Sequence, residues 1–174
     1  ETEKTYNDPT VFHFFGLYKL EEQGIATEQF ALHSIKCWEI WVEPSELEGE
    51  FRSFLGECMV HKTPPRMAAI EKKSTGVTLL SVLNGLRGIE MRPINRTKAS
   101  GAKTTRYLEM QPAIAKKLLS FTKGAPHARL CIEHMIRITA NDTHKHDDIC
   151  DTIYDAVKIG LLSKTLHFDV EEEE

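Results

Sequence analysis

Three aspartates and two histidines lie within the eight residues of HKHDDICD, which spans residues 144–151. Asp147 and Asp148 would begin a helix, where one carboxylate can cap free N–H groups. Such a cap stabilises a helix by about 0.5–2 kcal/mol. Capping does not explain a second aspartate beside the first, nor Asp151 one turn later. Carboxylates on one helix face repel unless a cation or basic group compensates them. The stretch therefore indicates either a solvated helix start or a site for a hard cation such as Mg²⁺ or Mn²⁺.

The same stretch offers a second metal hypothesis. His144, His146 and Cys150 carry nitrogen and sulfur donors of the kind that bind zinc. Their HxH-plus-cysteine spacing is irregular for a zinc motif, so the carboxylate hypothesis ranks above it.

A further carboxylate, Glu71, follows the apolar run MAAI at 67–70. A short apolar run of this kind fits a buried, central strand, and Glu71 would lie at its carboxyl end. Ligands of open α/β sheets bind outside the carboxyl ends of the strands. The alternative is a strand-end carboxylate that faces water or pairs with Lys72 or Lys73.

Basic residues are concentrated in the middle of the chain. The segment 92–123 holds eight of them against one acid, Glu109. A basic surface of this kind can bind phosphates, although a solvated helix face has the same composition. The eight residues are Arg92, Arg96, Lys98, Lys103, Arg106, Lys116, Lys117 and Lys123.

The hydrophobic pattern predicts the elements that must position these side chains. Two long strands around the turn EEQG form an antiparallel hairpin, and alternating strands and helices follow before a helical end. This order predicts an α/β fold with a mixed sheet. The predicted strands are 9–20, 26–44, 67–73 and 89–94, the predicted helices are 45–62, 75–88, 105–120, 127–139 and 146–164, and 95–106 is a basic loop.

Length and composition bound the class of protein. The chain of 174 residues is 41% hydrophobic and 28% charged, as expected for one globular domain. It contains no apolar run near the roughly 20 residues of a membrane span. Its four cysteines form no CxxC pair and indicate reduced, mostly buried thiols in a cytosolic compartment. We expect one domain over 1–170 and a disordered acidic tail over 171–174.

Several motifs occur in an order that resembles the nuclease domain of tailed-bacteriophage terminase large subunits, which belongs to the ribonuclease H-like superfamily. They are IEKKSTGVTLL at 70–80, KTTR at 103–106 and HDDICD at 146–151, where the last helix begins. YNDPTVFHFFGLY at 6–18 also resembles the second strand of such domains, with Asp8 at its usual turn. The resemblance extends over nearly the whole chain.

The resemblance implies a ribonuclease H-like mixed central sheet flanked by helices. It implies an endonuclease that depends on Mg²⁺ or Mn²⁺ and cuts concatemeric phage DNA during genome packaging, with two metals activating water and stabilising the leaving oxygen. The expected partners are double-stranded DNA, the packaging ATPase domain of the same subunit, the portal and the small terminase subunit. The expected location is the host cytoplasm, with no membrane association.

The resemblance also assigns residues. Glu71 takes the second acidic position of the metal site, and Asp147 or Asp148 takes the last, with Asp148 favoured. His146 is a ligand or supports one. The basic residues expected to contact the DNA backbone are Lys103, Arg106, Lys98 and Arg96.

Two departures from the family pattern carry expectations of their own. The strand that carries the family's first metal-binding aspartate precedes the position of Asp8 and is not contained in the sequence. We therefore expect at most one weakly bound cation, and a vacant strand position beside 9–20 and 67–72. The sequence also contains no GxxxxGK[ST] motif for an ATPase phosphate loop. The alternatives are a resolvase- or transposase-type nuclease, or a non-catalytic nucleic-acid-binding domain of the same fold.

Overall fold

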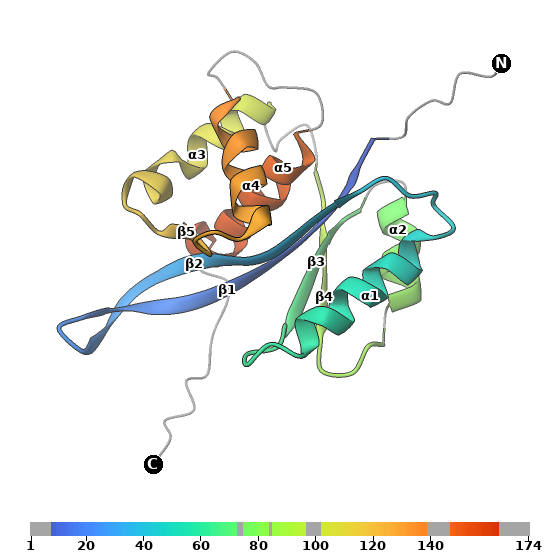
Figure 1. The fold of residues 1–174 in the computed structure, drawn as a ribbon, viewed down its shortest axis with the longest axis horizontal. Helices are drawn as coiled ribbons and strands as arrows, with labels where there is room; N and C mark the ends of the chain where they lie inside the picture. The colour runs from blue at the N-terminus through green and yellow to red at the C-terminus, as the bar shows by residue number, and fades with distance from the viewer. Residues whose placement is uncertain (1–7, 73–74, 84, 97–101, 139–146, 164–174) are drawn as a thin grey trace.

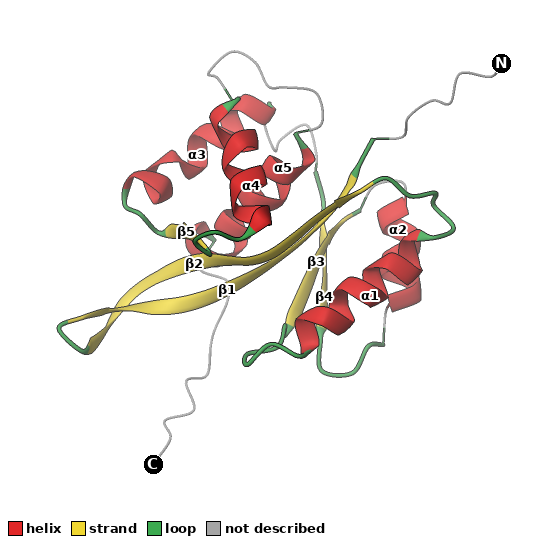
Figure 2. Ribbon diagram, in the orientation of Figure 1, coloured by secondary structure: helices red, strands yellow, loops and turns green. Residues whose placement is uncertain are grey.

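The fold is a mixed α/β arrangement, as the sequence predicts. In the computed structural model, a three-stranded mixed sheet and a two-stranded parallel sheet pack with helices (Figure 2). The acidic tail at 171–174 lies outside the described residues. The structure describes residues 8–72, 75–83, 85–96, 102–138 and 147–163.

Two long strands, β1 (Thr10–Glu22) and β2 (Ile25–Ile40), form the predicted antiparallel hairpin. Gln23 and Gly24 join them with φ angles of 54° and 80°. Two successive positive φ angles give a turn whose twist matches that of the flanking strands. The hairpin is the longest feature of the molecule and runs between its two groups of helices (Figure 1).

A βαβ unit follows the first helix, α1 (Leu47–Met59). It consists of β3 (Met67–Glu71), α2 (Thr75–Leu83) and β4 (Glu90–Ile94), with β3 and β4 parallel. Both strands lie where the sequence predicts strands. The prediction of a buried, central strand before Glu71 is wrong within the described residues, because β3 is only partly buried and pairs with β4 alone. The helix was predicted to reach residue 88 but ends at Leu83, because Gly85 and Gly88 adopt φ angles of 118° and 81° that no helix contains.

Three helices complete the fold: α3 (Lys103–Ala115), α4 (Pro126–Ile136) and α5 (Asp148–Val157), the last continued by the π-helical turn η2 (Lys158–Leu162). The prediction of one helix over 105–120 is wrong at its end. Lys117 has a φ of 57°, which terminates the helix, and β5 (Leu119–Phe121) then pairs parallel to β2. A three-residue strand has too short a pattern to be recognised from sequence.

The two faces of the hairpin carry separate hydrophobic cores. Phe12 and Phe14 pack against α1 and α2, whereas His13 between them faces α5 and contacts Thr152. Successive side chains of a strand point to opposite faces, so this alternation sorts the residues of β1. The core on the second face joins β2 to α3, α4 and α5.

Within the described residues, β1 pairs only with β2, and β3 pairs only with β4. Strands β1 and β3 therefore each have one unpaired edge within the described residues. From the sequence, a vacant strand position was expected beside both. None of the described helices is long and apolar enough to cross a membrane.

Candidate functional site

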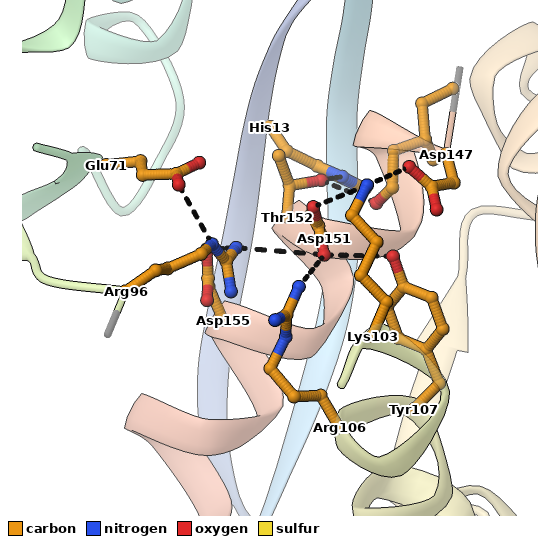
Figure 3. A network of polar contacts seen from close by, with 11 residues as sticks. His13, Glu71, Arg96, Lys103, Arg106, Tyr107, Asp147, Asp151, Thr152 and Asp155 are labelled. Carbon is orange, nitrogen blue, oxygen red and sulfur yellow. Dashed lines mark hydrogen bonds and ion pairs between the residues drawn. The ribbon is translucent and has the colours of Figure 1, made fainter. Parts of the chain in front are cut away.

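A network of ion pairs joins the carboxyl end of the β3–β4 sheet to the first two turns of α5 (Figure 3). We call it the α5 network. Its acidic members come from β3 and α5, and its basic members come from α3 and from the segment after β4. It consists of Glu71, Asp147, Asp151, Asp155, Arg96, Lys103, Arg106 and Tyr107.

Arg96 links the sheet to the helix. Its Nε lies 3.2 Å from Oε1 of Glu71, and its Nη2 lies 2.9 Å from Oδ2 of Asp155 and 3.8 Å from Oδ1 of Asp151. Glu71 ends β3 and Arg96 follows the end of the neighbouring β4, so the parallel pairing places both at one edge of the sheet. Gly76 lies so close to the backbone of Glu71 that a Cβ at this position would be 2.0 Å from the Glu71 carbonyl oxygen. Only glycine therefore fits at position 76 without a shift of the backbone.

Asp147, Asp151 and Asp155 are spaced four residues apart and share one face of α5. Asp147 is the N-cap residue, but its side chain makes no capping hydrogen bond and instead contacts Lys103. Local capping therefore does not account for this aspartate. Basic residues from other elements compensate the negative charges on this face of α5.

Asp151 lies at the centre of the network. Tyr107 donates a hydrogen bond of 2.9 Å to its Oδ1, Arg106 donates one of 3.1 Å to the same oxygen, and Lys103 Nζ lies 3.6 Å from Oδ2. All three donors belong to the first turns of α3, where residues three and four apart share a face. The arrangement clamps α3 to α5.

Burial changes the titration of two aspartates. It raises the pKa of Asp148, with the charges of Asp147 and Asp151 adding to the effect and Lys103 opposing it. It also raises the pKa of Asp155 to about 7. The ion pair with Arg96 alone would lower that pKa, so burial together with the charges of Asp151 and Glu71 outweighs Arg96.

The elevated pKa of Asp155 predicts a pH-dependent stability. A carboxyl whose pKa is higher in the folded state stabilises the fold when protonated, so its contribution is full below pH 3.8 and is lost as the pH rises through about 7. At roughly 1.4 kcal/mol per pKa unit, the contribution is at most about 4 kcal/mol. Asp155→Asn should therefore gain stability relative to the parent between pH 4 and pH 8, as measured by urea unfolding.

Glu48→Gln serves as a control for this measurement, because Glu48 is exposed on α1 and pairs with Arg52. Its difference from the parent should stay nearly constant with pH. An equally flat difference for Asp155→Asn would contradict the assignment.

The structure brings most of the predicted site residues together. Glu71, Asp147, Arg96, Lys103 and Arg106 all belong to the α5 network. Asp148, the favoured ligand, is the next residue of α5 and is half-buried. His146 and Lys98 lie outside the described residues, as does His144 of the zinc hypothesis.

The basic residues have surroundings that the sequence did not indicate. The Arg106 side chain is only 7% exposed and contacts Asp151, while the Lys103 side chain is 45% exposed. Lys103 is thus the more accessible of the two to a DNA backbone. Binding of DNA by either residue stays a prediction.

Asp155 and Tyr107 are members that the sequence analysis did not select. The spacing of Asp147, Asp151 and Asp155 by four residues is a signal that could have added Asp155. Tyr107 could not be found in this way, because its contact with Asp151 joins two separate helices.

The donor chemistry of the site fits a hard divalent cation, since carboxylate oxygens are the ligands that Mg²⁺ and Mn²⁺ prefer. In the described residues, however, no three carboxylate side chains bring one oxygen each within 4.8 Å of one another. Arg96 stands between Glu71 and the carboxylates of α5, and Lys103 stands between Asp147 and Asp151 (Figure 3). The basic groups supply the charge compensation that a cation would otherwise provide.

Comparisons of this chain with protein-family models, with curated proteins and with solved structures give no match. The residues and the geometry of the α5 network are therefore the basis for a proposed function.

Proposed function

We propose that this chain is a DNA endonuclease domain of the ribonuclease H-like type that depends on Mg²⁺ or Mn²⁺, similar to the nuclease domain of phage terminase large subunits. One observation carries the proposal. Glu71 at the end of β3 and the acidic face of α5 are distant in sequence but meet in one network, together with Lys103 and Arg96. Hydrolysis of a phosphodiester needs carboxylates for cations and basic groups for phosphate, and this network contains both.

The sheet arrangement supports the ribonuclease H-like assignment. In the family, the first strand lies between the strands that β1 and β3 resemble. One edge of β1 and one edge of β3 are unpaired within the described residues, which is compatible with that order. The parallel β3–β4 pair and the acidic start of α5 follow the order of the family motifs.

In this proposal, Glu71 and Asp148 would hold divalent cations, and Asp147 would contribute further oxygens. Bound cations would activate water and stabilise the leaving oxygen of the cleaved phosphodiester. Lys103, which is partly exposed beside Asp147, would contact a phosphate of the DNA backbone. Arg96 would orient Glu71 through their ion pair of 3.2 Å.

The proposed substrate is double-stranded, concatemeric phage DNA. The proposed partners are a packaging ATPase domain of the same subunit, the portal and the small terminase subunit, and the proposed location is the host cytoplasm. These assignments come from the family resemblance of the motifs around Glu71, Lys103 and Asp148.

A second candidate is a non-catalytic nucleic-acid-binding domain of the same fold. The compensation of the carboxylates by Arg96, Lys103 and Arg106 favours it, because a fully paired network needs no cation. Conversion of supercoiled plasmid to nicked circles in Mn²⁺ separates the two functions. An endonuclease cuts the plasmid, whereas a binding domain retains it uncut.

Lys103→Gln should weaken DNA binding irrespective of sequence. Each lysine that contacts a phosphate releases counterions, so the variant should reduce the slope of log K against log salt by about 0.9. Fluorescence anisotropy of a labelled duplex between low and moderate salt measures both quantities. Arg129→Gln is the control, since Arg129 is 86% exposed on α4, away from the network.

If Lys103→Gln has the same salt slope and DNA affinity as the parent, Lys103 does not contact DNA and only pairs with Asp147 and Asp151. Arg106 is unsuitable for this measurement because it is buried against Asp151. Thermal unfolding of Lys103→Gln should accompany the titration, to show that the variant is folded.

A further inference from the structure

A second group of potential metal ligands lies within the core that joins the hairpin to α4 and α5. His13 of β1, Cys37 of β2 and Cys131 of α4 each offer one donor atom, and these atoms lie within 4.8 Å of one another. Cys131 is fully buried and Cys37 is 7% exposed. It is the one such cluster of histidine, cysteine or acidic side chains found in the part of the chain that the structure describes.

The hairpin register brings the first two residues together. His13 and Cys37 are directly opposite in the antiparallel β1–β2 pair, so their side chains lie on the same face of the sheet. Helix α4 packs on β2 and adds Cys131 to this face. His127, one helical turn before Cys131, is on the same side, and its Nε2 contacts the carbonyl oxygen of Ser34 at 3.4 Å.

Hydrogen bonds determine the tautomer of His13. The Thr152 hydroxyl donates to the Ile149 carbonyl at 2.8 Å, so it accepts a hydrogen bond from Nδ1–H of His13 at 3.0 Å. Nε2 then carries the lone pair, which accepts a hydrogen bond of 2.7 Å from the Ser34 hydroxyl. An imidazole whose far N–H is held by a protein oxygen is the usual arrangement of a metal-binding histidine. For Nε2 to bind a metal, the Ser34 hydroxyl would have to turn away from it.

Burial also affects the ionisation of these side chains. Burial, with the nearby His127, lowers the pKa of His13 to about 3, so the imidazole is neutral near pH 7. A hydrogen bond between the thiols raises the pKa of Cys37, to which burial adds, and lowers the pKa of Cys131.

We propose that His13, Cys37 and Cys131 form a structural zinc site that ties α4 to the hairpin. One nitrogen and two sulfur donors are a soft set that selects zinc over Mg²⁺ or Mn²⁺. Bonds of about 2.3 Å to sulfur and about 2.0 Å to nitrogen place tetrahedral ligands roughly 3.5–3.8 Å apart, so donors that lie within 4.8 Å must approach by about 1.3 Å at most. His127, which lies on the same side of α4 but outside this group of donor atoms, is the candidate for the fourth ligand.

This site is independent of the proposed nuclease function, because it shares no residue with the α5 network. Two alternatives use the same cysteines. Both thiols could simply pack in the core, as Cys58 does among Phe51 and Phe54. They could also form a disulfide, which would need an oxidant and would remove both zinc ligands.

Cobalt titration tests the proposal on the full chain after reduction and removal of metals with a chelator. One Co²⁺ per chain should produce a near-ultraviolet charge-transfer band from thiolate sulfur and the strong visible bands of tetrahedral cobalt. Cobalt bound to carboxylates of the α5 network gives no thiolate band, so the two sites are distinguished. Zinc should displace the cobalt, and binding should tighten as the pH rises because the thiols must lose protons.

Cys37→Ser and Cys131→Ser should each weaken cobalt binding at least about a hundredfold, and His13→Gln should also reduce it, because each removes a direct ligand. Cys58→Ser is the matched control, a buried cysteine in the other core that should keep the parent's affinity. Absence of a thiolate band in the reduced parent would overturn the proposal, whether or not the variants fold. An equal loss in Cys58→Ser would also overturn it.

Discussion

Glu71→Gln and Asp148→Asn should each reduce Mn²⁺-dependent nicking of supercoiled plasmid at least about a hundredfold. Each change keeps the size of the side chain and removes the negative charge that a hard cation requires. Metal ions supply several kcal/mol of transition-state stabilisation, and roughly 1.4 kcal/mol corresponds to a tenfold change in rate. Rates of nicking at saturating Mn²⁺, compared with the parent, measure the effect.

Both variants should remain folded. Glu71 ends β3 and Asp148 begins α5, and neither belongs to a hydrophobic core. Glu90→Gln makes the same chemical change at the opposite end of the β3–β4 pair, where Glu90 is 61% exposed and pairs with Arg92. It should cut at the parent's rate. Unchanged cutting by both Glu71→Gln and Asp148→Asn would reject the metal-site assignment.

Asp151→Asn should lower the free energy of unfolding by about 3–5 kcal/mol, because it removes one partner of a buried ion pair. The Asp151 and Arg106 side chains are only 14% and 7% exposed. Water therefore cannot solvate the Arg106 charge once its carboxylate partner is lost. Arg96 and Lys103 also lose a counter-charge within 4 Å. Urea unfolding at constant pH measures the change, provided that the dependence on urea concentration keeps the parent's slope.

Glu133→Gln is the matched control for this loss. Glu133 pairs with Arg129 at 2.7 Å, a shorter distance than the 3.1 Å between Arg106 and Asp151. The side chains of Glu133 and Arg129, however, are 41% and 86% exposed. Exposed pairs contribute about 0–1 kcal/mol, so burial and not distance should decide the outcome. Similar small losses for both variants would show that Asp151 is not a structural centre of the network.

The arrangement also separates the stabilising and catalytic roles of the aspartates. Asp151 receives hydrogen bonds from Arg106 and Tyr107 and joins α3 to α5. Asp148 is half-buried beside it, with its pKa raised by burial. We therefore expect the variant at Asp151 to lose stability first, and the variant at Asp148 to lose cutting while keeping its fold.

Local patterns in the sequence determined much of the fold. The alternation along 9–20 and 26–44 predicted the hairpin, and the apolar run before Glu71 predicted β3. Such patterns are readable because a strand or helix exposes one face at a fixed period. The acidic start of α5 was equally visible, since Asp147, Asp148 and Asp151 are close in the chain.

Tertiary structure alone decided how the charged side chains are paired. The sequence predicted Arg106 where a basic loop over 95–106 meets a helix over 105–120, but packing of α3 on α5 buries it against Asp151. Strand β5 likewise exists because β2 offers it an edge, not because three residues carry a pattern. His13, Cys37 and Cys131 meet through a strand register and a helix packing contact between segments far apart in the chain. Such contacts depend on the relative placement of whole elements, which no local period encodes.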